Sequence, residues 1–196
     1  MFSVLITSSL SLMQLDPLSK SAGTAGAPVK VSDTWLVALY LIPFAGIAFL
    51  WFIAVLRRRI GRGEDQFFAT AFLGSGLLFI AMLFAAGAAA TAAVAAAQSG
   101  TERELDPAFV FGRSLANALF YVFTIKMAAV FMLVSSTIGR RTGFLPRWFI
   151  ILGMIGAAVM LVSVGFFEPL ALIFPAWVAV VSVLILRARP DSWSAS

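Results

Sequence analysis

Five long apolar runs, separated by charges or helix breakers, constrain this chain more than any other feature. They cover residues 35–56, 67–97, 108–138, 148–167 and 170–186. A hydrocarbon core about 30 Å thick needs roughly 17 to 25 helical residues to cross it, so each run is long enough. Lipid offers no partners to backbone groups and the runs lack strand alternation, so each run is expected to be α-helical. The sequence therefore predicts an all-α integral membrane bundle of five transmembrane helices.

Composition supports a location in a membrane and limits the kinds of function that the chain can have. The chain is 61% hydrophobic and 12% charged, whereas soluble domains are about half apolar. It has no cysteine and no histidine, which removes disulfides, thiolate nucleophiles, histidine bases and zinc sites built on those ligands. We therefore expect no catalytic apparatus, no cofactor and no metal site.

Arginine placement predicts the orientation. The basic clusters follow the first, third and fifth runs: Arg57, Arg58, Arg59 and Arg62; Arg140, Arg141 and Arg147; Arg187 and Arg189. Five crossings place all three clusters on one side, which the positive-inside rule makes the cytoplasm. The N-terminus is then outside and the C-terminus inside. Because the basic residues flank apolar runs and form no stripe interleaved with aromatics, nucleic acid is not an expected partner.

The termini flank a bundle that covers residues 34–187. Residues 1–33 are expected to lie outside, as a short amphipathic helix on the outer interface followed by a flexible connector, with a disordered tail as the open alternative. Residues 188–196 form a cytoplasmic tail.

The last two runs leave one question of topology open. As a single helix of about forty residues they would be near 60 Å long, twice the hydrocarbon thickness, so the Glu168-Pro169 step is expected to break them. Run length favours two crossings. A re-entrant hairpin that never crosses would leave the flanking arginines equally well placed.

Small residues indicate close helix packing. Ala81, Ala85, Ala89, Ala93 and Ala97 repeat at a spacing of four in the second run, and Gly153 and Ala157 do so in the fourth. Rows of this kind let helix backbones approach in lipid, within one chain or between chains. We expect membrane lipids as partners, together with a homo-oligomer or a larger membrane complex.

Lys126 is the charge that most needs an explanation. It lies fourteen residues, roughly 21 Å, before Arg140, which leaves it about 10 Å inside the hydrocarbon boundary. An unrelieved charge at such depth costs about 2.5 to 3.5 kcal/mol or more. Relief is expected from a carboxylate, from carbonyls freed by a proline kink, from a water-filled cavity or from a neutral amine. Snorkelling or structural pairing, an anion or lipid-headgroup site, and chemistry on the amine remain open.

Further polar residues lie on the same run. An α-helical wheel places Arg113, Asn117, Tyr121 and Thr124 on one side and Lys126 roughly opposite Asn117. Arg113 is expected at the outer interface, with Glu168 as an ion-pair partner. The candidate residues for binding an anion or lipid headgroup are Lys126, Arg113, Asn117, Tyr121 and Glu168.

Three segments resemble a known group. "FFATAFLGSGLLFIAMLFAAG" (67–87), "IKMAAVFMLVSSTIGRRTGFLPRWFIILG" (125–153) and "IFPAWVAVVSVLIL" (173–186) are similar to small polytopic membrane proteins of high-GC Gram-positive bacteria that have no established function. The motifs "RTGFLPRW" and "FPAWV" are not needed for spanning, so they are more specific than hydrophobicity. The resemblance implies a multi-pass protein of the bacterial cytoplasmic membrane and implies no activity.

These observations predict a membrane-embedded binding, scaffold or accessory subunit that is not an enzyme. The alternative is an anion or small-solute transporter or channel that uses Lys126 as an intramembrane cationic site. A lipid enzyme with Glu168 as acid or base is the weakest hypothesis, because a second titrating partner is lacking.

Overall fold

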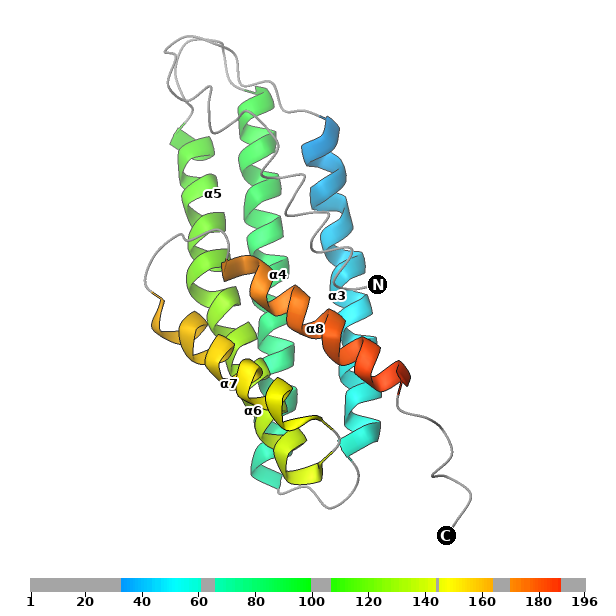
Figure 1. Ribbon diagram of the computed structural model, residues 1–196. Helices are drawn as coiled ribbons and strands as arrows, with labels where there is room; N and C mark the ends of the chain where they lie inside the picture. Colours follow the sequence, from blue (N-terminus) through cyan, green and yellow to red (C-terminus); the bar gives the residue numbers. More distant parts are fainter. Residues whose placement is uncertain (1–32, 61–65, 100–106, 144, 164–169, 188–196) are drawn as a thin grey trace.

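The computed structural model describes residues 33–60, 66–99, 107–143, 145–163 and 170–187, and these ranges are helical apart from short connections (Figure 1). The elements are α3 (Asp33–Ile60), α4 (Gln66–Ser99), α5 (Pro107–Asn117), the π-helix η1 (Ala118–Thr124), α6 (Ile125–Thr142), α7 (Arg147–Val162) and α8 (Leu170–Arg187). α5, η1 and α6 follow one another without a break and form one long column, the α5–η1–α6 column. The all-α prediction is confirmed for these ranges.

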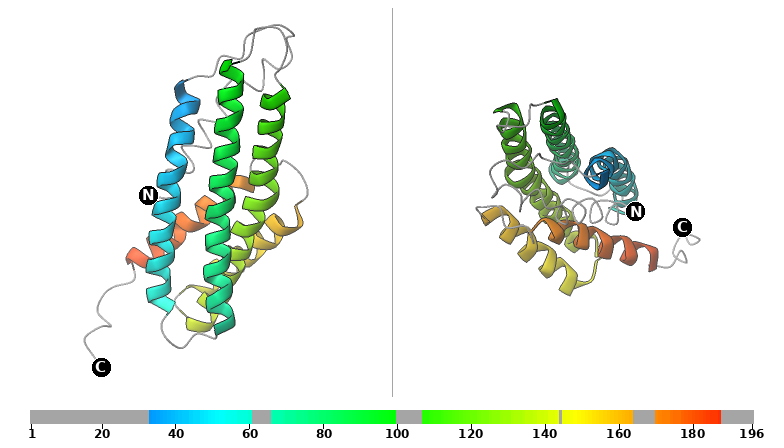
Figure 2. Two further views of the ribbon diagram at one scale, coloured as in Figure 1. Left: turned by 180° about the vertical axis from the view of Figure 1, so that it is seen from behind. Right: turned by 90° about the horizontal axis from the view of Figure 1, so that it is seen from above.

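Three long helices form one layer of the molecule. Within the described residues, Leu39–Arg58, Gln66–Ala96 and Pro107–Thr142 are long and apolar enough to cross a membrane. They stand side by side, whereas α7 and α8 lie obliquely across one face of this layer (Figures 1 and 2). Membrane-capable helices are thus confirmed for the first three predicted runs.

The α7–α8 pair covers only the lower half of that face. α7 starts near the lower end of the bundle and ends at about half its height, and α8 starts at half height and descends again (Figures 1 and 2). α7 has 16 residues, which correspond to about 24 Å, shorter than a hydrocarbon core of about 30 Å. The predicted run 148–167 was too long, because the helix ends at Val162 and Ser163 has a non-helical ψ of 120°. Glu168 lies outside the described residues, as do residues 1–32 and 188–196.

Prolines and a glycine mark several helix ends. Pro107 is the first residue of α5, where its fixed φ suits the first helical turn. Pro146 is the N-cap of α7, with φ −66° and ψ 143°. α6 ends at Gly143, whose φ of 72° is the left-handed conformation that glycine adopts without a steric penalty.

Aromatic side chains join the two layers. Phe49 of α3 lies 5.0 Å from Phe79 of α4 and 5.2 Å from Phe131 of α6, measured between ring centroids. Phe174 of α8 reaches into this cluster, 4.9 Å from Phe79. All four rings are buried, so α8 is fastened to the three-helix layer by a side chain that penetrates it.

The predicted row of alanines packs inside the chain only in part. Ala93 is buried and Ala89 half-buried, whereas Ala81 and Ala85 are exposed, and the buried Ala86 and Ala90 lie outside the row. α5 approaches the backbone of α4 at Gly112, where an added side-chain carbon would lie 3.2 Å from the Ala93 backbone. The sequence predicted close packing correctly, but a run made almost entirely of alanine does not reveal which side packs.

Candidate functional site

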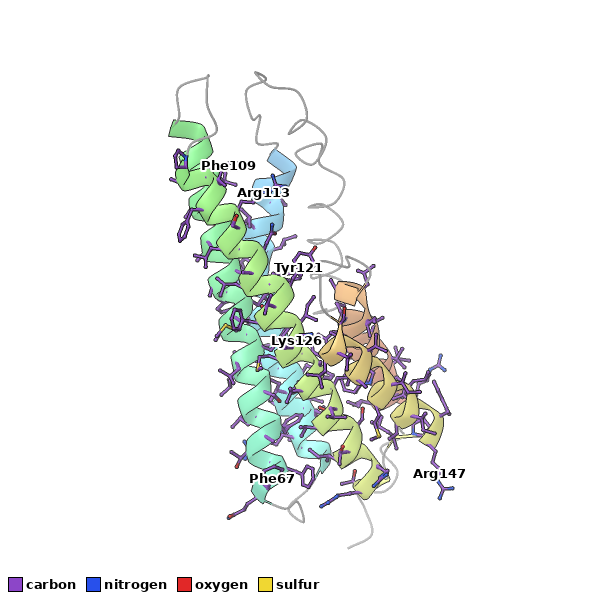
Figure 3. All side chains as sticks on the ribbon, turned by 90° about the vertical axis from the view of Figure 1, so that its left-hand side faces the viewer. Phe67, Phe109, Arg113, Tyr121, Lys126 and Arg147 are labelled. Atoms are coloured by element: carbon purple, nitrogen blue, oxygen red, sulfur yellow. The ribbon has the colours of Figure 1, made fainter. Side chains whose placement is uncertain are left out.

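Lys126 reaches the end of α7. It is the second residue of α6 and lies at half the height of the bundle, beside the tip of the α7–α8 pair (Figure 3). Its ammonium Nζ donates hydrogen bonds to the carbonyl oxygens of Met160, Leu161 and Ser163, at 2.9, 2.7 and 2.6 Å. Residues 34 to 37 positions away in the sequence therefore hold this charge.

The chemistry of the ammonium matches what the helix end lacks. The last carbonyls of an α-helix have no partner within the helix. At the end of α7 the Ser163 amide donates to the Val159 carbonyl at 2.9 Å, and the next two carbonyls bond to Lys126. An ammonium has three donors and no acceptor, and a cation at a helix C-terminus also interacts favourably with the helix dipole. One side chain thus satisfies three acceptors.

This arrangement decides between the expected ways of relieving the charge. Backbone carbonyls were one of them, but they come from a helix end and not from a proline kink. Asp33 is the only acidic residue in the described ranges, so the contacts that the structure gives Lys126 involve no carboxylate. All three donors of the ammonium are in use, and an anion at Nζ would have to displace a carbonyl.

The π-helix η1 turns Lys126 toward this partner. Within η1 and at its end the bonds run five residues back: the Thr124 hydroxyl donates to the Leu119 carbonyl at 2.9 Å, and the Ile125 amide to the Phe120 carbonyl. Each residue inserted by such a wide turn rotates the rest of the helix by about 100° relative to a regular α-helix. The wheel that placed Lys126 opposite Asn117 was therefore wrong. Figure 3 shows Arg113, Tyr121 and Lys126 along one side of the column.

The other predicted site residues do not converge on Lys126. The side chains of Arg113 and Asn117 are exposed on α5, higher up the column. Tyr121 is half-buried, with its ring 5.2 Å from that of Phe120. Thr124 is buried and bonded to its own helix. The structure therefore separates a mid-height cation from an upper polar pair, and Glu168 lies outside the described residues.

The buried face of α7 includes two small residues at its centre. Gly153 and Ala157, the predicted pair, are both buried, and so is Ser136 on α6. A side-chain carbon on Gly153 would lie 2.8 Å from Nε1 of Trp177 and in steric overlap with Oγ of Ser136. Gly153 thus allows α6, α7 and α8 to meet at one point.

Two buried polar atoms at this junction are unpaired. Oγ of Ser136 and Nε1 of Trp177 have no hydrogen-bond partner among the described residues, and neither does Oγ of Ser135, the preceding residue of α6. Such atoms cost about 1–3 kcal/mol each when buried unpaired. Sequence reasoning missed this group. The only signal was the serine pair within an apolar run.

No protein-family model matches the sequence, and comparisons with curated proteins and with solved structures found no match.

Proposed function

We propose that this chain is a non-enzymatic, membrane-embedded scaffold or accessory subunit of the bacterial cytoplasmic membrane. The observation that supports this most is the use of Lys126, whose ammonium completes the end of α7 through three hydrogen bonds. The charge that looked most like a functional site is thus part of the framework. The exterior of the molecule is apolar. It carries two surfaces that take no part in the internal packing: one of small residues on α4 and one of polar residues on α5.

For the topology we propose three crossings, by α3, α4 and the α5–η1–α6 column, with the N-terminus outside. The α7–α8 pair is a re-entrant hairpin that enters and leaves on the cytoplasmic side. Support comes from the length of α7, from the half-height position of its end (Figure 1) and from the ammonium bound there. Backbone that ends at membrane depth is tolerated only where protein or water satisfies it. Both termini of the pair remain beside the arginine clusters, so the positive-inside rule is still obeyed.

The absence of cysteine makes the topology directly testable. Glu168→Cys in cells, treated from outside with a membrane-impermeant maleimide, is expected to stay unlabelled if the pair is re-entrant. Five crossings place this position in an outer loop and predict strong labelling. Glu102→Cys, outside in both topologies, and Ser194→Cys, inside in both, are the matched controls.

A surface of small residues on α4 supports assembly with a second copy. Five exposed alanines follow one another at alternating spacings of four and three: Ala81, Ala85, Ala88, Ala92 and Ala95. This spacing keeps them on one helical stripe, and small residues favour association in lipid. Ala88→Cys is expected to give a disulfide-linked dimer under mild oxidation, whereas Val55→Cys, an exposed position on α3, is expected to stay monomeric.

The transporter hypothesis is less well supported, because an anion passing mid-depth needs free donors and those of Lys126 are occupied. In liposomes we expect no anion flux above background from the wild type. Wild-type flux that Lys126→Met abolishes, in a variant that still elutes as a folded species, would overturn the scaffold proposal in favour of transport.

A further inference from the structure

Two exposed polar side chains lie one helical turn apart on α5. Arg113 and Asn117 are separated by four residues, which places them on the same face of the helix. Figure 3 shows Arg113 well above the α7–α8 pair. Neither residue takes part in holding the end of α7 or in joining the two layers.

Their depth in the membrane differs by one turn. Pro107–Thr142 has 36 residues, which correspond to about 54 Å of helix, so a centred column extends about 12 Å beyond a 30 Å core at each end. Arg113 is about 9 Å from the start of the column, at the level of the headgroups. Asn117 is about 15 Å from the start, just inside the hydrocarbon boundary, where its exposed amide needs a partner.

The order of these two side chains along the membrane normal matches the order of the polar groups in a glycerophospholipid. A guanidinium binds phosphate oxygens through paired hydrogen bonds, and a carboxamide has two N–H donors for a carbonyl. In such a lipid the ester carbonyls lie directly below the phosphate. We propose that Arg113 and Asn117 bind one glycerophospholipid of the outer leaflet, with the phosphate on Arg113 and an ester carbonyl on Asn117.

An apolar side chain deeper in the column fits this occupant. Val122 of η1 is exposed and lies five residues, about one wide turn of helix, beyond Asn117, where an acyl chain would cover it and a free phosphate ion would not. A lipid also accounts for an exposed amide below the headgroup level, which phosphate alone leaves unpaired. The depths of the two side chains rest on the proposed crossing of the column, and the assignment to the outer leaflet rests on the proposed orientation.

The test is lipid retention by purified protein in detergent, with a phosphatidylglycerol as the probe, measured by native mass spectrometry. Arg113→Gln is expected to weaken binding about ten-fold or more, as for a lost charge-assisted hydrogen bond. Arg141→Gln, an exposed arginine at the other end of the column, is the matched control and is expected to bind as the wild type does. If Arg113→Gln does not fold, Arg113→Lys, which keeps the charge without the paired donors, is expected to bind with intermediate affinity.

An ether-linked phospholipid separates the two contacts, because it has the phosphate and lacks ester carbonyls. Asn117→Leu is expected to weaken binding of the diester lipid about three-fold and to leave binding of the ether lipid unchanged. Equal binding by Arg113→Gln and Arg141→Gln would overturn the proposal, as would complete competition by millimolar inorganic phosphate. Neither result bears on the scaffold role, which the labelling and cross-linking tests address separately.

Discussion

The terminal backbone groups of the long helices and those at the end of α7 lie in different surroundings. α3, α4 and the α5–η1–α6 column extend over the full height of the bundle (Figure 1), so in the proposed topology their terminal N–H and C=O groups reach the interfaces, where water satisfies them. α7 ends at half height, where the Lys126 ammonium takes the place of water. The comparison teaches that a charge within a hydrophobic run can be the structural counterpart of a helix that stops inside the bundle.

The largest expected effect comes from removing that ammonium. Lys126→Met leaves three carbonyls without their donor and is expected to lower the free energy of unfolding by about 3–5 kcal/mol. Thermal unfolding in detergent measures the loss of stability. Limited proteolysis between α7 and α8 shows where the structure is weakened. Arg58→Met, which changes an exposed cation on α3, is the control and should leave stability nearly unchanged. Equal stability of the two variants would mean that the end of α7 does not depend on Lys126.

The next largest loss of stability is expected when the packing of the α7–α8 pair on the long helices is disturbed. Gly153→Ala adds a carbon 2.8 Å from the Trp177 ring nitrogen and in steric overlap with Ser136, so we expect a destabilisation of about 1–3 kcal/mol. Gly74→Ala on α4 meets no atom within 4 Å and is expected to be neutral or to stabilise by about 0.5–1 kcal/mol. The difference between the two variants in thermal unfolding is the measurement. If they behave alike, α7 does not pack as closely on α6 as these distances imply.

The smallest expected effect is a gain in stability. Ser136→Ala removes a buried hydroxyl that has no partner in the described structure. We expect stabilisation of up to about 1 kcal/mol, because the penalty for an unpaired buried hydroxyl disappears. Thr137→Ala, on the next position, removes a hydroxyl bonded to the Leu133 carbonyl and should not stabilise. A loss of stability in Ser136→Ala would show that its hydroxyl has a partner, such as an ordered water.

Several features of the fold were predictable because they depend on neighbouring residues alone. The five helices lie where the apolar runs lie, and Pro107 begins its helix because its fixed φ suits a first turn. The end of α7 was not predicted, since residues 163–167 carry no charge and still include one valine and two phenylalanines. The register after Asn117 was missed for a similar reason: an α-helical wheel assumes uniform turns, and η1 interrupts them.

By itself, the sequence determined that the described chain is helical and apolar enough for a membrane. It also showed that the arginines cluster at three positions along the chain. Both are properties of composition and local spacing. It also marked Lys126 as a charge in need of compensation. Only the tertiary structure decided what compensates it. The acceptors are backbone carbonyls at Met160, Leu161 and Ser163, and every residue has a carbonyl. No sequence pattern distinguishes these three until α7 packs its small residues on α6 and stops there.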